Sequence, residues 1–428
     1  MKKIIFNSMW LIFERLTNII GGLLVTIYVA RYLGPENMGL INYSLAIGAL
    51  IVPISQLGSD VTIFNRAAKK EASAVILLKT TNNLRLIICI ILIILSVSYF
   101  YIKADNKDNT AILTLMMAAC LFTSLDIYRY FFDGILKSKL NSIAAQLGIY
   151  LSLFTRFFFV KLNLCLIYFT VPFILSVAIP FFIRYKFFSK LYKNISFKKI
   201  KRKKNKYNKY LIYTGIPLTL SSLSIVFYTK INQIFIGEYL DMGAVGIFNA
   251  ATTLSQGWSF IPIAIITSLF SQILRGSNKR LKDGASLLYL ITILISAPII
   301  IIMNLYSFEI IFHTYGNAFI DASHLLTILS ISSFFSVAGT ISYRTIIAMG
   351  GYKFVMYKMF IMAGFNIILN IILIKYYGVL GAVYATLITE FIGATVANFF
   401  FKKGIIFKCM IHTFFPRKYI NSFLDSPN

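Results

Sequence analysis

The residues in this sequence that are best suited to chemistry are charged side chains inside long apolar stretches. Glu14 and Arg15 interrupt the apolar run 7–30, and Lys230 interrupts the run 211–236. An ionisable side chain at membrane depth costs roughly 2.5–3.5 kcal/mol on insertion scales, so it faces protein or water and marks a functional position. A cation held there can bind an anionic group. We interpret Arg15 and Lys230 as parts of one solvated cationic cavity; the alternative is an arginine paired with a packed neighbour and a lysine that snorkels to the surface.

Each of these two runs has a polar helical face. In the first run, positions i, i+7, i+11 and i+14 lie on one side of a helix and carry Asn7, Glu14, Asn18 and Gly21. In the second run, the polar side carries Thr219, Ser222, Lys230 and Gln233. Polar faces of this kind are expected to contact protein or water rather than lipid.

The composition identifies the class of protein. Of the 428 residues, 58% are hydrophobic and 13% are charged, and the mean hydropathy is +0.77. A chain this apolar is typical of a membrane protein that crosses the bilayer many times. The four cysteines and three histidines have neither metal-ligand nor disulfide spacing, so we expect no metal site and no cofactor.

Apolar runs long enough to cross a bilayer as helices occur twelve times. They cover 7–30, 39–60, 84–102, 111–132, 142–160, 164–185, 211–236, 243–271, 285–304, 322–346, 356–374 and 379–401. We therefore predict an all-α membrane protein with two pseudo-symmetric six-helix bundles, at 1–185 and 210–401. A basic cytoplasmic linker is expected at 186–209 and a basic cytoplasmic tail at 402–428.

The basic residues indicate the orientation. The formal net charge of +27 could suggest nucleic-acid binding. With both termini in the cytoplasm, however, most of the 42 Lys and Arg residues fall in cytoplasmic segments, including 61–85 and 184–209. This is the positive-inside pattern of membrane proteins, and we do not expect nucleic acid as a partner. The linker is also a candidate for contact with anionic lipid headgroups.

The two halves contain a related segment. Residues 32–42 read YLGPENMGLIN and residues 239–249 read YLDMGAVGIFN. At a constant offset of 207 residues, four positions are identical: Tyr32 and Tyr239, Leu33 and Leu240, Gly39 and Gly246, Asn42 and Asn249. Both segments fall between the first and second predicted span of their half. The halves are therefore expected to be parallel repeats, each entering the membrane in the same direction.

Several motifs carry a family resemblance. They are WLIFER in the first run, VARYLGPENMGLINYSLAI after it, QLGSD at 56–60, DIYRYFFDG at 126–134 and GVLGAVYAT at 378–386. With these motifs the chain resembles the polysaccharide and O-antigen flippases of the multidrug/oligosaccharidyl-lipid/polysaccharide exporter superfamily. The resemblance implies a fold like that of multidrug-and-toxin-extrusion proteins. It also implies translocation of a polyprenyl-diphosphate-linked oligosaccharide across the bacterial inner membrane by alternating access.

The resemblance also implies roles for individual residues. Cations at membrane depth are expected to meet the diphosphate, and here these are Arg15, Lys230 and, as a weaker third, Arg156. Sugar hydroxyls need polar partners, and amides within the spans are available at Asn18, Gln233, Asn249, Gln256, Asn366 and Asn370.

A coupling ion, either a proton or sodium, would need a carboxylate at membrane depth. Glu14, Asp126 and Glu390 qualify, although Glu14 is equally well interpreted as the salt-bridge partner of Arg15. Two gate networks are also candidates. One comprises Asp126, Arg129 and Asp133 on the cytoplasmic side, and the other Arg31 and Glu36 on the outer side.

Other functions remain open at this stage. A multidrug exporter of the same fold is the alternative, although Arg15 and Lys230 would repel cationic drugs. A membrane glycan polymerase or ligase is less favoured, because no long outer loop or catalytic pair is present. Expected partners are the lipid-linked oligosaccharide, membrane lipids and the glycan polymerase machinery.

Overall fold

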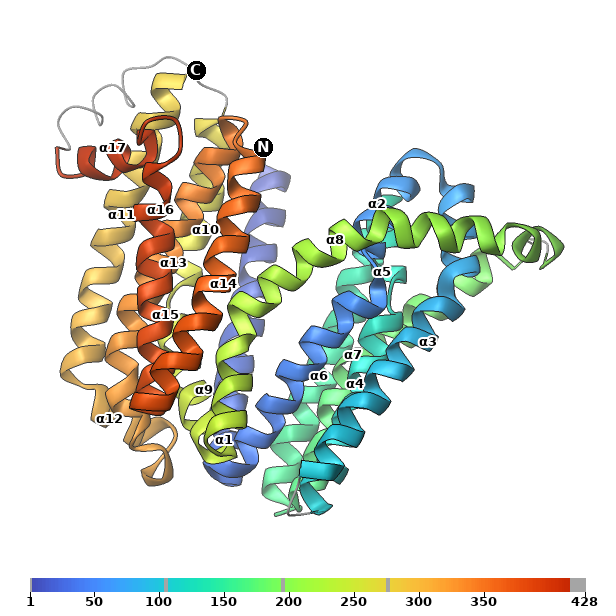
Figure 1. Ribbon diagram of the computed structural model, residues 1–428, viewed down its shortest axis with the longest axis horizontal. Coiled ribbons are helices and arrows are strands. Elements are labelled where there is room, and N and C mark those ends of the chain that lie inside the picture. Colours follow the sequence, from blue (N-terminus) through green and yellow to red (C-terminus); the bar gives the residue numbers. More distant parts are fainter. Residues whose placement is uncertain (1, 104–106, 194–196, 275–277, 416–428) are drawn as a thin grey trace. The chain divides into compact units, whose positions relative to one another are not determined.

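The computed structural model describes residues 2–103, 107–193, 197–274 and 278–415, and it describes side chains throughout these ranges except at 2–20, 107–108, 197–204, 271–272 and 278–279. Every regular element within this described part is a helix (Figure 1). Contacts divide the chain into two compact units, unit 1 at Met1–Lys230 and unit 2 at Ile231–Asn428.

Unit 1 is built on long helices that lie side by side. Its core pairs are α3 with α4, α4 with α7, and α6 with α7 (Figure 1). Two short helices, α2 and α5, pack on each other and on one end of α3 and α7, where phenylalanines such as Phe131, Phe132 and Phe188 are buried. The elements are α1 (Lys2–Gln56), α2 (Ser59–Lys69), α3 (Glu71–Lys103), α4 (Lys107–Leu125), α5 (Tyr128–Gly134), α6 (Ser138–Lys161), η1 (Leu166–Phe169) and α7 (Thr170–Leu191), followed by α8 (Phe197–Tyr239), which continues into unit 2.

Unit 2 is organised around its central helix α13, which contacts α9, α11 and α15, while α14 packs on α15. The hydroxyl groups of Tyr289 on α11 and Ser342 on α13 share a buried hydrogen bond of 2.8 Å. The remaining elements are α9 (Met242–Gly257), α10 (Phe260–Ile273), α11 (Asn278–Leu305), α12 (Ser307–Thr314), η2 (Asn317–Phe319), α13 (Ala322–Ala348), α14 (Tyr352–Tyr377), α15 (Val379–Ala394), α16 (Val396–Phe399) and α17 (Ile405–His412).

The predicted membrane helices are confirmed. Within the described residues, ten helices are long and apolar enough to cross a membrane, and the bent pair Met242–Gly257 and Phe260–Phe270 adds an eleventh. The first of the ten, in α1, is interrupted at Gly34, whose φ of 78° and ψ of 171° are not helical. The predicted runs 7–30 and 39–60 lie on either side of this break, which accounts for the twelfth span.

The two repeat segments break the chain at equivalent positions by different means. Gly34 adopts a positive φ that glycine allows at little cost, and Pro35 then begins the next helical run. At the offset of 207 residues, Gly34 corresponds to Asp241, which is extended and precedes α9. The Asp241 carboxylate accepts a hydrogen bond of 2.7 Å from the backbone N–H of Ala244, which is an N-cap. One break therefore depends on backbone freedom and the other on side-chain capping.

Within the described residues, the predicted linker falls in the end of α7 and the start of α8, and the predicted tail contains the short helix α17. Helix α7 continues to Leu191, α8 begins at Phe197, and the division between the units falls inside α8. In the tail, α17 packs on α11, and Ser286 donates a hydrogen bond of 2.9 Å to the Cys409 carbonyl. The exact domain limits remain a prediction.

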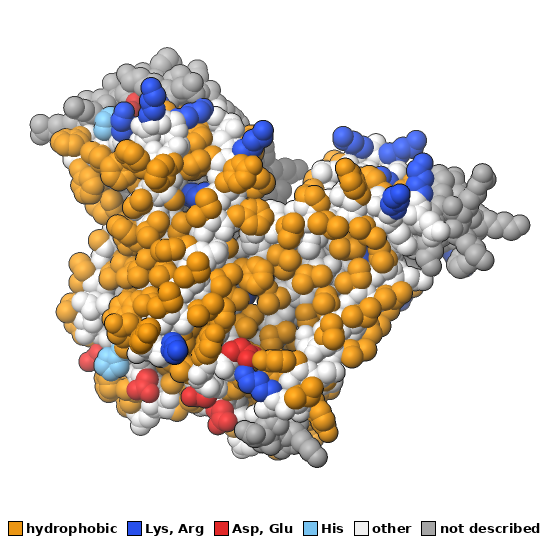
Figure 2. Space-filling view, viewed as in Figure 1, with side chains coloured by type: hydrophobic (Ala, Val, Ile, Leu, Met, Phe, Trp, Pro, Cys, Tyr) orange, Lys and Arg blue, Asp and Glu red, His pale blue; other side chains and the backbone are white. Residues whose placement is uncertain are grey.

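The surface matches a protein that crosses a membrane. On the face in Figure 2, hydrophobic side chains cover the sides of the helices, while Lys and Arg gather at the α2 end of unit 1 and the α17 end of unit 2. Large apolar side chains such as Leu95, Phe154 and Leu294 are more than half exposed. Because a soluble protein rarely exposes apolar area on this scale, these surfaces face lipid. The chain is a multi-pass membrane protein.

Candidate functional site

The clearest polar site in the described part of unit 1 lies where the fourth span is interrupted. Helix α4 ends at Leu125 and α5 begins at Tyr128, which leaves Asp126 at the break. Its carboxylate pairs with the guanidinium of Arg184 on α7, and Arg184 is only 4% exposed. Arg184 also donates a hydrogen bond of 3.1 Å to the carbonyl of Asn141, at the start of α6. Three spans are thereby tied together at one point.

The charge pattern did not indicate this contact. It counts Arg184 in the basic segment 184–209, and the structure shows that α7 extends past Arg184 and buries its side chain against Asp126. The position of Arg184 in the aromatic stretch FFIRYKFF, inside the predicted span 164–185, is the signal that could have identified it.

The predicted network of Asp126, Arg129 and Asp133 is brought together, but through residues that the sequence did not indicate. The Asn141 amide donates hydrogen bonds of 2.8 Å both to the Arg129 carbonyl and to Asp133 Oδ1. Asp126 is held by Arg184, and the charge of Arg129 also acts on it. Asn141 and Arg184 are therefore the missing members of this network. Its role as a gate remains a prediction.

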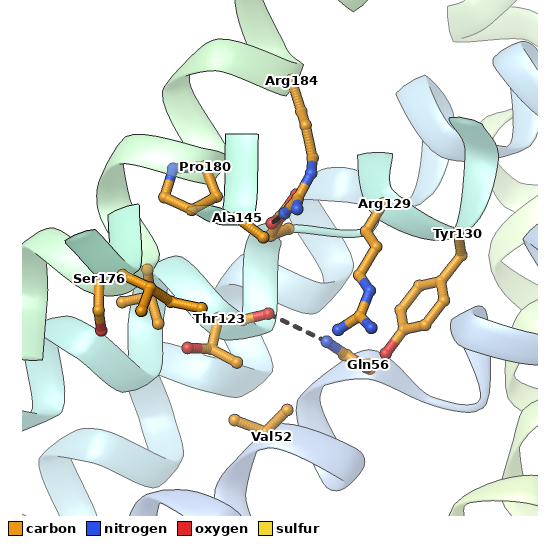
Figure 3. Close-up of a pocket in the computed structure, with 12 residues that line it drawn as sticks. Val52, Gln56, Thr123, Arg129, Tyr130, Ala145, Ser176, Pro180 and Arg184 are labelled. Carbon is orange, nitrogen blue, oxygen red and sulfur yellow. Dashed lines mark hydrogen bonds and ion pairs between the residues drawn. The ribbon is translucent and has the colours of Figure 1, made fainter. Parts of the chain in front are cut away.

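A cavity of about 200 Å³ opens beside this network (Figure 3). Its polar lining includes Arg129, Tyr130 and Gln56, and in Figure 3 the Arg129 guanidinium points toward the other two. The Gln56 amide donates a hydrogen bond of 3.0 Å to the Thr123 carbonyl. The full lining comprises Val52, Gln56, Thr123, Asp126, Arg129, Tyr130, Ala145, Ile149, Ser176, Val177, Pro180 and Arg184.

Arg156, a predicted substrate contact, lies further along α6, on the helix face that also lines the cavity. Ala145, Ile149 and Arg156 follow a helical stripe on α6, and Phe173 occupies the corresponding stripe of α7. The Arg156 guanidinium stacks 3.9 Å from the centre of the Phe173 ring, and its Nε is buried without a hydrogen-bond partner. No carboxylate in the described part of the chain forms an ion pair with it. Arg156 is thus a cation inside unit 1 that is held by an aromatic ring.

A second buried arginine in unit 1 was not singled out by the sequence. Arg85 on α3 falls in the segment 61–85 that the charge pattern assigns to the cytoplasm, yet its side chain is completely buried. Its guanidinium donates to Thr81 Oγ1 at 2.8 Å, to Ser59 Oγ at 3.3 Å and to the Leu78 carbonyl at 3.2 Å. These contacts attach α3 to the start of α2, which is a structural role.

Two of the predicted amides of unit 2, Asn366 and Asn370, form a buried ladder with Asn232, which the sequence did not single out. Asn370 donates to Asn232 Oδ1 at 2.7 Å and to Asn366 Oδ1 at 3.1 Å, and Asn232 donates to Thr386 Oγ1 at 2.5 Å. Gln233 reaches Asn249 Oδ1 at 3.5 Å. These amides bind one another and join α8, α14 and α15, so any contact with substrate remains a prediction.

Glu390 lies near Lys358, a cation that the sequence did not single out as a site residue. Lys358 on α14 donates to the Gly393 carbonyl at 3.0 Å and to Asn398 Oδ1 at 2.8 Å, close to the end of α15. The charge of Glu390 acts on this lysine. Lys358 therefore lies within unit 2 and binds the C-terminal end of α15, where a positive charge is favourable.

The remaining predicted site residues are Glu14, Arg15, Asn18, Lys230, Arg31, Glu36 and Gln256. The side chains of Glu14, Arg15 and Asn18 lie outside the described residues. Lys230, on α8, is half-buried, and no hydrogen bond or ion pair joins it to the part of the chain that the structure describes. Arg31 and Glu36 are exposed on either side of Gly34, and Gln256 is exposed at the end of α9. The described residues contain no group of three His, Cys, Asp or Glu side chains that could hold a metal ion.

Comparison with known proteins identifies the family. Residues 4–273 match the model of a family described as polysaccharide biosynthesis protein, and this match covers more than half of the chain. The chain belongs to this polysaccharide biosynthesis family. An uncharacterized membrane protein of Methanocaldococcus jannaschii, MJ1068, is 24% identical over 202 residues, which are 47% of this chain and 38% of that protein. The chain therefore spans less than half the length of that relative.

Solved structures share the fold of this family member. A structure titled lipid II flippase MurJ, in an inward closed conformation, is similar to this chain with a TM-score of 0.69 and 17% sequence identity. The similarity covers 97% of this chain and 92% of the MurJ chain. An inward-facing multidrug resistance MATE family transporter of the MOP superfamily has a TM-score of 0.62 and 14% identity, covering 94% and 96%. The twelve-helix architecture is thus one that transporters of this superfamily also have.

Proposed function

We propose that this polysaccharide biosynthesis family member is a secondary transporter that flips a polyprenyl-diphosphate-linked oligosaccharide across the bacterial cytoplasmic membrane by alternating access. The observation that carries the proposal is a set of cations at membrane depth without acidic partners among the described residues. Arg156 stacks on a ring and Lys230 has no described partner. The fold shared with a lipid II flippase supports a substrate of the same general kind.

The physical reason is the hydration of the headgroup. A diphosphate that enters hydrocarbon loses its hydration, which is prohibitive for unpaired charge. Guanidinium and ammonium groups can replace that hydration with charge-assisted hydrogen bonds. The lipid tail can remain in the bilayer while the headgroup crosses.

Complementation of a deletion strain tests this function. Loss of the gene should leave lipid-linked oligosaccharide on the cytoplasmic leaflet, and the wild-type chain should restore its export. Arg15→Ala and Lys230→Ala should each lower export at least about tenfold, which is the effect of losing one hydrogen bond to a charged group. Lys375→Ala, which removes an exposed lysine at the end of α14, is the matched control and should export normally. Wild-type export by both Arg15→Ala and Lys230→Ala would refute the cationic site.

The competing function is multidrug export. The structure titled as a multidrug resistance MATE family transporter has the same fold as this chain. A cavity for cationic drugs should present carboxylates, whereas Arg156 and Lys230 would repel such drugs. Cells that express the chain should therefore accumulate a cationic dye to the same extent as cells without it. Lower accumulation would favour the drug exporter.

We also propose that both termini are cytoplasmic, which a native cysteine can test. Cys165 is exposed between α6 and η1 and would lie on the outer side, while Cys89, Cys120 and Cys409 are buried. Burial raises the pKa of the Cys409 thiol to about 11, so little reactive thiolate forms near neutral pH. A membrane-impermeant maleimide should therefore label right-side-out vesicles at Cys165, and Cys165→Ser should abolish the labelling. Labelling only after the vesicles are opened would reverse the topology.

The proposed transporter also needs a coupling ion and a protein that uses the translocated oligosaccharide. The proposed carboxylates for a coupling proton or sodium ion are Glu14, Asp126 and Glu390, of which Asp126 also pairs with Arg184. The glycan polymerase machinery is a further proposed partner, since it would use the oligosaccharide after translocation.

A further inference from the structure

The cavity beside Asp126 has polar atoms that lack partners. Asp126 Oδ1 and Arg184 Nε are both buried and have no hydrogen bond. The Arg129 guanidinium points into the cavity (Figure 3), and no hydrogen bond or ion pair holds it within the described part of the chain. Buried polar groups are nearly always paired. Arg184 Nε and Asp126 Oδ1 are therefore one buried donor and one buried acceptor without partners, and the exposed Arg129 guanidinium adds further donors at the cavity.

The charge around the cavity identifies the chemistry of this ligand. Two guanidinium groups, from Arg129 and Arg184, face one carboxylate, so the lining has an excess of positive charge. Guanidinium groups bind phosphate oxygens with strong, directional hydrogen bonds. The free oxygen of Asp126 requires a donor, such as a hydroxyl group. A cation would be repelled by both arginines, which excludes a sodium site at this position.

The size and walls of the cavity fit the same ligand. A volume of about 200 Å³ exceeds that of a single water molecule several times over. Gln56, Tyr130 and Ser176 add neutral polar groups to the lining, and Val52, Val177 and Pro180 add an apolar wall. Neutral polar groups beside apolar atoms suit the face of a sugar ring.

We infer that this cavity of unit 1 binds a glycosyl phosphate, with the phosphate on Arg129 and Arg184 Nε and a sugar hydroxyl on Asp126 Oδ1. The inference rests on the proposed function and deepens it, because a lipid-linked oligosaccharide presents this group where the sugar joins the diphosphate. The cavity lies at the α5 end of unit 1, which the proposed topology places on the cytoplasmic side. It would thus be a first capture site for the headgroup before translocation.

Binding measurements on the full-length protein test this site. The protein is placed in phosphatidylcholine nanodiscs and titrated with inorganic pyrophosphate, glucose 1-phosphate or a short-chain prenyl diphosphate linked to N-acetylglucosamine. Arg129→Gln should weaken binding of all three at least about tenfold, as expected for a lost hydrogen bond between charged groups. Lys137→Gln, which removes an exposed positive charge from the turn before α6, is the matched control and should change binding less than about twofold, as is usual for exposed charges.

The outcomes separate the possible ligands. Tighter binding of glucose 1-phosphate than of inorganic pyrophosphate, with the preference lost in Asp126→Asn, would support a glycosyl phosphate. If Arg129→Gln and Lys137→Gln lose affinity equally, the probes bind through the overall positive charge of the surface, and the proposed site is wrong. Displacement of all three probes by phosphatidylglycerol in the nanodisc would assign the cavity to an anionic phospholipid and would also overturn it.

A flipping assay distinguishes failure of the site from failure of the proposed function. If wild-type protein in liposomes flips the lipid-linked sugar and Arg129→Gln flips and binds it equally well, only the capture site is refuted. If Arg129-dependent binding is present but no flipping occurs, the site stands and the proposed function fails.

Discussion

Replacement of Arg184 by alanine is expected to lower the free energy of unfolding of unit 1 by about 3–5 kcal/mol, the usual cost of removing one partner of a buried ion pair. The Asp126 carboxylate would remain in the interior without its counterion, and its Oδ1 already lacks a hydrogen bond. The Asn141 carbonyl would lose its donor as well. Thermal unfolding of the purified protein in detergent measures the change.

A double variant shows whether Arg184→Ala loses stability because Asp126 is left unpaired or because packing is lost. Asp126→Asn/Arg184→Met removes both charges while keeping side-chain volume, and it should recover most of the stability that Arg184→Ala loses, because no unpaired charge remains. Arg129→Ala, at an exposed position of the same network, should have a small effect. If the double variant is less stable than Arg184→Ala, the pair is not the source of the stabilisation.

Gly381→Ala is expected to destabilise unit 2 by about 3 kcal/mol, the upper part of the range for overpacking. A Cβ at Gly381 would lie 2.1 Å from the Leu373 carbonyl oxygen and 2.6 Å from the Ile374 backbone nitrogen. Both neighbours are backbone atoms, so the clash can be relieved only by separating α14 from α15. This would disturb the buried hydrogen bond of 3.1 Å that Asn366 on α14 donates to Thr389 Oγ1 on α15.

Gly364→Ala is the matched control for this prediction. Gly364 lies within α14, and a Cβ there would meet no atom within 4 Å. Since alanine favours a helix over glycine by about 1 kcal/mol, this variant should be as stable as wild type or more stable. Equal unfolding temperatures for Gly381→Ala and wild type would show that α14 and α15 are not packed as closely as described.

The membrane helices could be predicted from the sequence because each depends on a local property. An apolar run of about twenty residues must form a helix to satisfy its backbone in lipid, and all twelve runs correspond to helices or to the two halves of α1. The break at Gly34 and the cap at Asp241 also lie within the segments that the repeat identified.

The candidate site was only partly predictable. Asp126, Arg129 and Asp133 are close in sequence, so their grouping followed from helical spacing, but Arg184 and Asn141 come from two other helices. Charge counting also did not show that Arg85 and Arg184 are buried or that Lys358 binds Asn398, because it treats a basic residue near the end of a span in the same way whether its side chain is exposed or buried.

The sequence by itself determined the class of protein, the positions of its membrane helices along the chain and the related segments of its two halves. These follow from hydrophobicity and backbone chemistry, which act on neighbouring residues. Only the tertiary structure decided which charges are paired. The contacts of Arg184 with Asp126, of Arg156 with Phe173 and of Lys358 with Asn398 join residues on different helices, and the packing of those helices decides whether a buried charge is neutralised or left to bind a ligand.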